Sequence, residues 1–270
     1  MSGLVVADPG LRSASAQTWP GIECEQLGEW QLRASRGYTG RANSVLVSGD
    51  PGLPIREAAD RATAFYRSRG LPVLVQIVIG SAEEQALRAI GWIEARPAEA
   101  DCWVMTRRLD DGVEDGPDVV SSSMPAVGLD GHLTGRWLSA RFPDGVPDGA
   151  PEVLGGGRCA FASVIGSDRR TVGLGRAAVS SGHVGVSCLW IEESQRRRGF
   201  GTQLLSALMR WGRAAGASTA FLEVLDDNVG ARAAYRRSGF VDRYAYRYLT
   251  RHSGSLSLSD PIVNGDSTPS

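Results

Sequence analysis

The feature that most constrains the fold is the segment Leu189–Thr202, which reads LWIEESQRRRGFGT. An apolar, strand-like run leads into a loop rich in arginine and glycine. That loop leads directly into Gly201–Ala215, whose apolar residues recur at helical spacing. A strand joined to a helix in this way predicts an α/β sheet, and the free N–H groups at the helix start would attract an anion such as phosphate.

The composition of this loop also suits phosphate. Gly199 and Gly201 carry no Cβ, so a pyrophosphate can approach the main chain closely. Arg196, Arg197 and Arg198 add positive charge that can pair with phosphate oxygens. We therefore expect a phosphate-bearing ligand at this junction.

The hydrophobic pattern predicts alternating strands and helices in both halves of the chain. In the second half we expect strands at Cys159–Ile165, Thr171–Val179, Gly185–Ile191, Thr219–Leu225 and Tyr244–Leu249, and a second helix at Val229–Ser238. In the first half we expect strands at Ser44–Ser48, Leu71–Ile79 and Asp101–Arg107, and helices at Ile55–Ser68 and Ala82–Ala89. Aligning Gly91–Trp92 with Gly239–Phe240 also aligns the preceding helix and strand, which predicts an internal duplication.

A length of 270 residues suits two domains of ordinary size. The run Asp110–Asp118 is acidic, contains glycine and is nearly free of apolar residues, so we expect a linker there. The expected organisation is a flexible arm at 1–18, a first domain at 19–109, the linker at 110–118, a second domain at 119–252 and a disordered tail at 253–270.

Charge and cysteine spacing exclude several classes of function. The net charge of −1 provides no field that would recruit nucleic acid or an anionic membrane. The four cysteines and three histidines are widely separated, so we expect no metal site and no disulfide framework. Free cysteines of this kind fit a reducing compartment, and we expect a cytoplasmic protein with no signal peptide.

The chain resembles the GNAT superfamily of acetyltransferases. The family's acetyl-CoA loop is Gln or Arg, two residues, Gly, one residue, then Gly or Ala, and Arg196–Gly201 matches it in full. A second family pattern follows at the expected distance, carried by Asn228, Ala231, Tyr235 and Gly239-Phe240. The clear resemblance covers about 153–249, and the first half shares only its outline. The resemblance implies two tandem GNAT-like domains, each a mixed twisted sheet flanked by helices, in a layout similar to that of mycothiol synthase.

The resemblance also implies a role for each matching residue. Acetyl-CoA would be the co-substrate, and no metal is implied. The main chain of Leu189, Trp190 and Ile191 would contact the pantetheine arm, and the amides of Arg197, Arg198, Gly199, Phe200, Gly201 and Thr202, with Arg196, would hold the pyrophosphate. Asn228 would bond the pantetheine, or cap its helix, or both. Tyr235 would donate a proton to the departing CoA thiolate.

The general base is a choice between carboxylates. Glu192 and Glu193 follow the strand that ends at Ile191, and Glu223 lies on the neighbouring strand. We favour Glu223 slightly, since its strand lines the expected cleft, whereas Glu192 and Glu193 also read as solvated loop charges. The acceptor would be a primary amine, first a small metabolite and second a peptide or protein amine. The alternative is an acyl-CoA sensor or interaction module without turnover, and the sequence leaves open whether the chain is a monomer or a homodimer.

The first half is expected to be catalytically silent. Under the alignment above, Leu87 stands where Tyr235 stands, and Gly80 where Asn228 stands. Its loop at 48–54 holds an acid and two prolines where phosphate requires bare amides. The polar run Arg36–Asn43 either lines a shared substrate cleft or is an ordinary loop.

Overall fold

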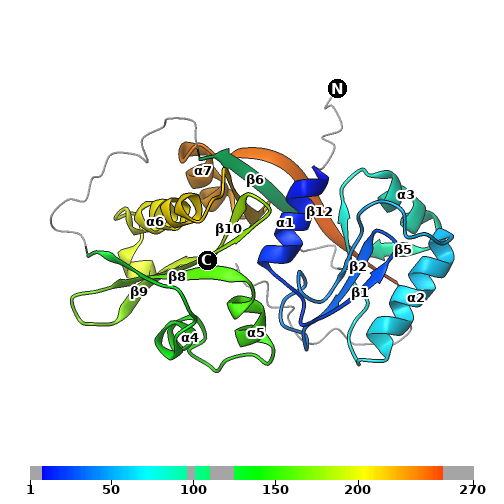
Figure 1. Cartoon of the computed structure of the whole chain (residues 1–270), viewed down its shortest axis with the longest axis horizontal. Coiled ribbons are helices and arrows are strands. Elements are labelled where there is room, and N and C mark those ends of the chain that lie inside the picture. The colour runs from blue at the N-terminus through cyan, green and yellow to red at the C-terminus, as the bar shows by residue number, and fades with distance from the viewer. Residues whose placement is uncertain (1–7, 96–100, 110–124, 252–270) are drawn as a thin grey trace.

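The computed structural model describes residues 8–95, 101–109 and 125–251. The first half contains α1 (Pro9–Thr18), β1 (Glu23–Leu27), β2 (Trp30–Ala34), β3 (Val45–Leu46), α2 (Ile55–Arg67), β4 (Val75–Val78), α3 (Ala82–Ala89), β5 (Trp92–Glu94) and β6 (Cys102–Arg108). The second half contains β7 (Val127–Asp130), α4 (Gly135–Arg141), α5 (Ala150–Gly155), β8 (Arg158–Ile165), β9 (Thr171–Ser180), β10 (His183–Ile191), the short 3-10 helix η1 (Glu193–Gln195), α6 (Phe200–Ala214), β11 (Thr219–Leu225), α7 (Val229–Arg237) and β12 (Val241–Arg251). The mixed α/β fold is confirmed (Figure 1).

The two halves are joined in one twelve-stranded sheet, in the order β1-β2-β3-β4-β12-β6-β11-β10-β9-β8-β7. The remaining strand, β5, pairs with β12 outside this order. Each half contributes one parallel strand pair, β3 with β4 and β10 with β11. Strand β6 lies before the expected linker, yet it pairs between β11 and β12, which both follow it. Strand β12 then continues beside β4. The expected division at 110–118 therefore does not separate two independent sheets, and the linker itself lies outside the described residues, as does the expected tail at 253–270.

The expected flexible arm at 1–18 is wrong for its second part, because residues 9–18 form α1. Asp8 caps this helix by accepting a hydrogen bond from the N–H of Gly10 at 2.9 Å. Leu11 and Ala14 are buried in a cluster with aromatic residues of β11 and β12. Small residues gave no apolar period in the sequence, but they let the helix lie close to the sheet: a Cβ built on Gly185 would stand 2.8 Å from Oγ1 of Thr18.

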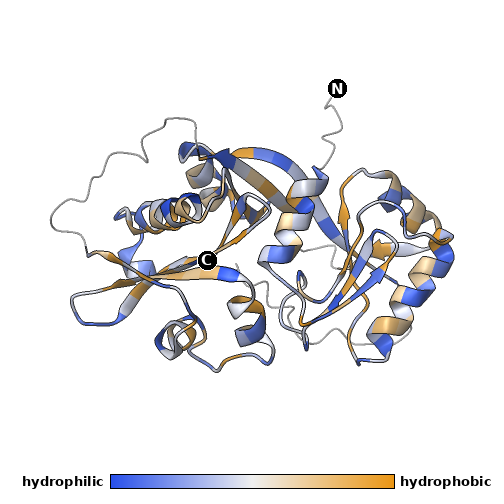
Figure 2. Ribbon diagram, in the orientation of Figure 1, coloured by the Kyte–Doolittle hydropathy of each residue, from blue (hydrophilic) through white to orange (hydrophobic). Residues whose placement is uncertain are grey.

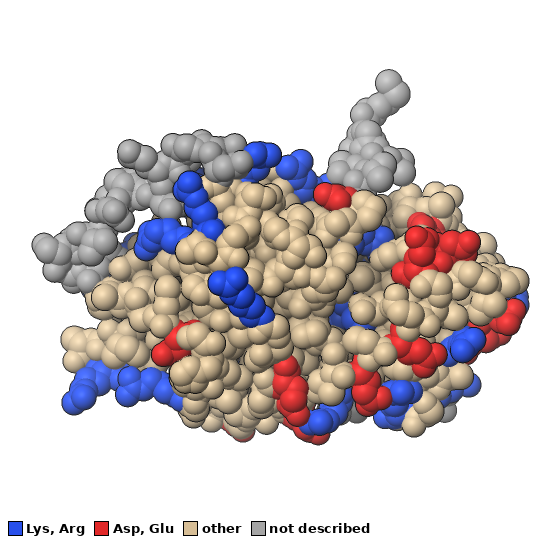
Figure 3. All heavy atoms as spheres, in the orientation of Figure 1, with Lys and Arg blue, Asp and Glu red and all other residues tan. Residues whose placement is uncertain are grey.

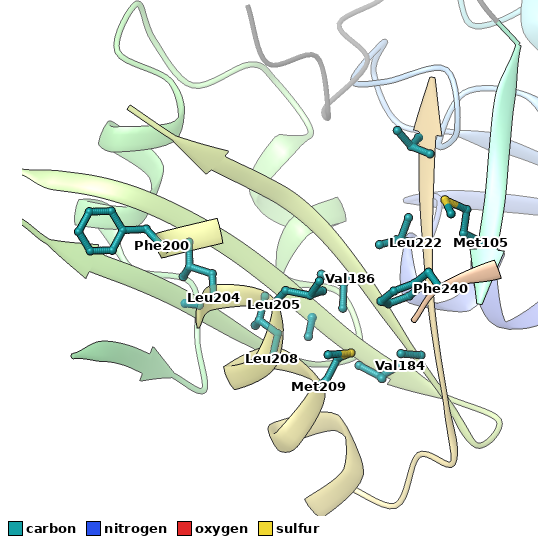
Figure 4. Close-up of a cluster of buried hydrophobic side chains, with 14 of the residues drawn as sticks. Met105, Val184, Val186, Phe200, Leu204, Leu205, Leu208, Met209, Leu222 and Phe240 are labelled. Atoms are coloured by element: carbon teal, nitrogen blue, oxygen red, sulfur yellow. The ribbon is translucent and has the colours of Figure 1, made fainter. Parts of the chain in front are cut away.

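The core of the second half explains why α6 forms where it does. Leu204, Leu205 and Leu208 are buried on one side of the helix and pack against Val184 and Val186 of β10 (Figure 4). A buried apolar face of this kind is what the helical spacing of the apolar residues predicts. Both the strands and the helices carry hydrophobic and hydrophilic residues (Figure 2). The first half has its own core around Trp30, between α2 and the strands β2 to β4.

Candidate functional site

The two parallel strands of the second half separate partway along their length. Strands β10 and β11 pair from His183 and Thr219 to Val186 and Leu222. Beyond that point β10 stays paired with β9, but its register shifts between Ser187 and Trp190. Cys188 within this irregularity has φ of 56°, in the left-handed region. The result is a fork whose open end is bordered by the last residues of β10.

A cleft of about 510 Å³ lies at the open end of this fork. It is lined by Leu189, Trp190, Ile191, Gln195, Arg196, Arg197, Gly199, Phe200, Gly201, Thr202, Leu205, Asn228, Gly230, Ala231, Ala234, Tyr235, Arg237 and Ser238. The structure thus brings together every residue that the sequence assigned to the cofactor except Arg198. The side chain of Arg198 instead bonds to that of Gln195.

The N-terminus of α6 opens into this cleft. Its N-cap is Gly199, which has φ of 87° and makes no side-chain capping bond. The first N–H groups of a helix have no partner within the helix, so those of α6 are directed at the cleft without a capping side chain. The macrodipole adds a partial positive charge at the same place. Arg196 anchors the loop to β10 through a bond from Nε to the carbonyl of Ile191 at 3.3 Å.

Helix α7 forms the opposite wall of the cleft. Asn228 accepts a hydrogen bond from the N–H of Ala231 at 3.1 Å through Oδ1, so it caps α7 while it also lines the cleft. Tyr235 lies two turns further along, with its ring 6.2 Å from that of Phe240. The sequence reasoning missed the small residues Gly230, Ala234 and Ser238, which line the cleft beside Tyr235. Their spacing of four residues from one another was the available signal, because i and i+4 positions share one helix face.

The candidate bases lie elsewhere. Neither Glu192 nor Glu223 borders the cleft. Glu223 is buried, and its Oε2 accepts a hydrogen bond from the Tyr246 hydroxyl at 2.6 Å. It also accepts one from Ser15 of α1, on the face of the sheet away from α6. Glu192 is half-buried at the start of η1. Tyr235 thus lines the cleft, whereas Glu223 points to the opposite face of the sheet and Glu192 precedes η1 outside the cleft lining.

The surroundings of the cleft are consistent with an anionic ligand. Figure 3 shows basic side chains over the half that contains α6, and acidic ones mainly over the first half.

Within the described residues, no group of three or more His, Cys, Asp or Glu side chains is arranged to hold a metal ion. In the same part of the chain, no helix is both long and apolar enough to cross a bilayer.

Comparisons with known proteins agree with this geometry. Residues 10–249 match the family model described as "Probable histone acetyltransferase Rv0428c C-terminal". The chain is 28% identical over 256 residues to "Uncharacterized N-acetyltransferase YobR" of Bacillus subtilis, covering 88% of this chain and 96% of that protein. It is also 28% identical over 252 residues to "Probable histone acetyltransferase Rv0428c" of Mycobacterium tuberculosis, covering 90% of this chain and 74% of the relative.

Two solved structures share the fold. A GCN5-related N-acetyltransferase from Kribbella flavida superimposes with a TM-score of 0.64 at 15% identity, covering 95% of this chain and 98% of that one. A tandem GNAT protein from the clavulanic acid biosynthesis pathway gives a TM-score of 0.61 at 15% identity, covering 79% and 76%. At these identities the likeness concerns the fold.

Proposed function

This chain belongs to the family of Rv0428c C-terminal regions and is a GNAT-type acyltransferase, and from this premise we propose that it transfers the acetyl group of acetyl-CoA to a primary amine. The observation that carries the proposal is the single cleft bordered by the open end of the fork, the uncapped start of α6 and Tyr235. Each of these three parts suits a different portion of one co-substrate.

The residues present fit acetyl-CoA. The N–H groups from Arg197 to Thr202 supply donors and a positive dipole for the pyrophosphate. The edge of β10 at Leu189–Ile191 supplies main-chain groups for the amide-bearing pantetheine arm, in the way an added strand is bound. Asn228 borders the same cleft with its amide group.

The reaction proposed needs no covalent intermediate. A neutral amine attacks the thioester carbon, so that a C–N bond forms and the C–S bond breaks. A backbone N–H of β10 polarises the carbonyl oxygen, and holding both reactants in one site removes most of the entropic cost. Tyr235 donates its proton to the departing thiolate, a task that suits a phenol because it is protonated at neutral pH. The proton of the incoming ammonium goes to a carboxylate, for which Glu223 is our first choice and Glu192 the second.

Two classes of acceptor fit this reaction, a small amine metabolite and a peptide or protein amine. The printed name of the mycobacterial relative favours the second, and the placement of Glu223 in a buried network favours the first. The alternative function is an acyl-CoA sensor that binds the cofactor without turnover.

Replacing Tyr235 by Phe tests the proposal. We expect kcat for acetyl transfer to fall about 100-fold while the Kd for acetyl-CoA stays unchanged, because only the proton donor is lost. Tyr66→Phe is the matched control: the Tyr66 hydroxyl lies in the first half and bonds to backbone atoms of Arg33, so its loss affects stability and leaves kcat unchanged. Acetyl-CoA binding without transfer in the wild-type protein would establish the sensor instead.

A further inference from the structure

A buried polar chamber lies on the face of the sheet opposite the cofactor cleft. Its centre is Glu223, whose side chain is only 2% exposed. Three separate parts of the chain bond to this carboxylate: Ser15 of α1, Tyr246 of β12, and Arg41 from the loop between β2 and β3, whose Nη1 is 3.4 Å from Oε2. The polar run Arg36–Asn43 thus contributes a cation to a buried carboxylate of the second half.

The chamber borders the fork at the first step where β10 and β11 are unpaired. Glu223 follows Leu222, and Ser187 follows Val186, the last paired residues of the two strands. Since side chains alternate across a strand, Glu223 and Ser187 both point away from the α6 side, on which Val186 and Leu222 are packed. Ser187 is 7% exposed, and within the described residues its Oγ has no hydrogen-bond partner. A buried hydroxyl of this kind at the fork is suited to a ligand that reaches the thioester from this side.

Helix α1 closes the chamber. It crosses between the two halves (Figure 1) and packs on β9 and β10, and its Leu11 contacts the aromatic cluster around Phe221. Beside the chamber, a free space of about 10 Å³ is lined by residues that include Arg12, Ser15 and Tyr246 but not Glu223 or Ser187, and it is close to the room that one water requires. An acceptor would enter by displacing part of α1, so this enclosure suits a small molecule and excludes the surface of a folded protein.

The charge of the chamber is unbalanced. Arg33 and Arg176 are 2% and 1% exposed, and Arg41, which pairs with Glu223, is half-buried. Carbonyl and side-chain oxygens satisfy the donors of Arg33 and Arg176, for example Gln76 Oε1 at 2.7 Å and Leu154 O at 2.6 Å, but these groups carry no negative charge. The other buried acid of the described residues, Glu84, is paired with arginines elsewhere.

Arg33, Arg41 and Arg176, together with the partly buried Arg12 of α1, therefore place four arginines in this region, in which Glu223 is the buried carboxylate. Burial lowers the pKa of both Arg33 and Arg176, and neighbouring Arg41 lowers that of Arg176 further. Charges in such a medium interact strongly, so the chamber favours a ligand that brings a negative group of its own.

We propose that the acceptor is a small amine that also carries a carboxylate, bound beneath α1 with its carboxylate at Arg41 and its amine at Glu223 and Ser187. This inference rests on the acetyl transfer proposed above. The acceptor's carboxylate takes over the ion pair with Arg41, which leaves Glu223 to receive the ammonium proton. The freed amine then forms the C–N bond as the C–S bond breaks, and Tyr235 protonates the thiolate.

The charge of the product tests this assignment directly. Acetyl-CoA with an isotopic label in its acetyl group is incubated with the full-length protein and either a low-molecular-weight bacterial extract or a lysine-rich histone peptide. Free acetate is removed by evaporation from acid, and labelled products are separated from acetyl-CoA and sorted by charge at neutral pH. Acetylation removes the positive charge of an amine, so an amino-acid-like acceptor becomes an anion, a simple amine becomes neutral and a lysine peptide remains a cation.

Label in small anionic products supports the proposal. Label only in neutral or cationic small molecules, or only in the peptide, overturns it while acetyl transfer itself stands. No label in any pool, with acetyl-CoA still bound, overturns both the transfer and this inference.

Variants of the loop before β3 provide a second test on the labelled acceptor. We expect Arg41→Met to raise the KM for the acceptor about 100-fold and Arg41→Lys about tenfold, with the Kd for acetyl-CoA unchanged in both. Arg36→Met is the matched control, because Arg36 lies in the same loop but pairs with Asp148 and Glu152 on the surface. An equal KM in Arg41→Met and Arg36→Met would overturn the role of Arg41.

Discussion

In both halves of the chain a parallel strand pair leads through a loop to an amphipathic helix, β3 to α2 and β10 to α6, but the amides of the two loops have different partners. In the first half the carboxylate of Glu29 accepts the N–H of Asp50 at 2.6 Å, and Asp50 accepts that of Gly52 at 2.8 Å. Acidic side chains of the protein itself thus accept the backbone N–H groups of this loop. In the second half Gly199 starts α6 without a capping side chain, and its loop borders the cleft.

The second helices of the two halves differ in the same direction. Leu87 of α3, which aligns with Tyr235, is fully buried in the core of the first half. Tyr235 of α7 instead lines the cleft. One copy has therefore used this position for packing, and the other keeps a hydroxyl at the fork. The comparison teaches that the shared fold provides the frame, while loop amides and one helix position decide which copy can bind and react.

The largest effect is expected from Gly199→Glu. A carboxylate at this N-cap would occupy the amides of α6 and repel phosphate, so we expect the affinity for acetyl-CoA in calorimetric titration to fall about 1000-fold, roughly 4 kcal/mol. Gly216→Glu is the matched control, since Gly216 follows the other end of α6 with a similar φ of 98°. Unchanged binding in Gly199→Glu would place the cofactor away from this loop, and two binding sites in the wild-type protein would show that the first half is not silent.

Truncation of a core leucine in each half is expected to have the next largest effect. Leu87→Ala and Leu205→Ala both leave a cavity and should each lower the free energy of unfolding by about 3 kcal/mol. Only Leu205 also lines the cleft, so only Leu205→Ala should weaken acetyl-CoA binding. Denaturant unfolding and calorimetry separate the two quantities. A loss of acetyl-CoA affinity in Leu87→Ala equal to that in Leu205→Ala would contradict the silence of the first half.

Removal of the two helix caps sharpens the comparison further. Ser81 caps α3 and Asn228 caps α7, each by accepting an N–H three residues ahead. Ser81→Ala and Asn228→Ala should each lower the free energy of unfolding by about 1 kcal/mol. We expect only Asn228→Ala to raise the Kd for acetyl-CoA as well. Equal Kd values for acetyl-CoA in the two variants would show that Asn228 caps α7 and does not contact the cofactor.

The smallest effect is expected from Glu29→Ala. Loss of the bond to Asp50 should lower the free energy of unfolding by about 0.5 kcal/mol, because the bond is exposed. We expect acetyl-CoA to bind with unchanged stoichiometry, since the two prolines and Asp50 remain in the loop. The appearance of a second binding site in this variant would show that Glu29 alone keeps the first half silent.

Much of the second half could be predicted from local sequence. The strand, the Arg196–Gly201 loop and the helical period of α6 are adjacent in the chain, and their hydrophobic patterns determine each of them independently. The turn at Gly239 has φ of 81°, as a helix-ending glycine should. In contrast, β1, β2, β7, α4 and α5 were not anticipated, because short strands and helices carry too few residues for a period to stand out.

The sequence by itself determined the α/β class, the anion-binding loop and the helix that bears Tyr235, because these depend on neighbours along the chain. Only the tertiary structure decided that β6 pairs between β11 and β12, that α1 packs on the sheet, and that Arg41 reaches Glu223. Those contacts join residues more than a hundred positions apart. Their free energy comes from burial and pairing in the assembled fold, which no local pattern of residues encodes.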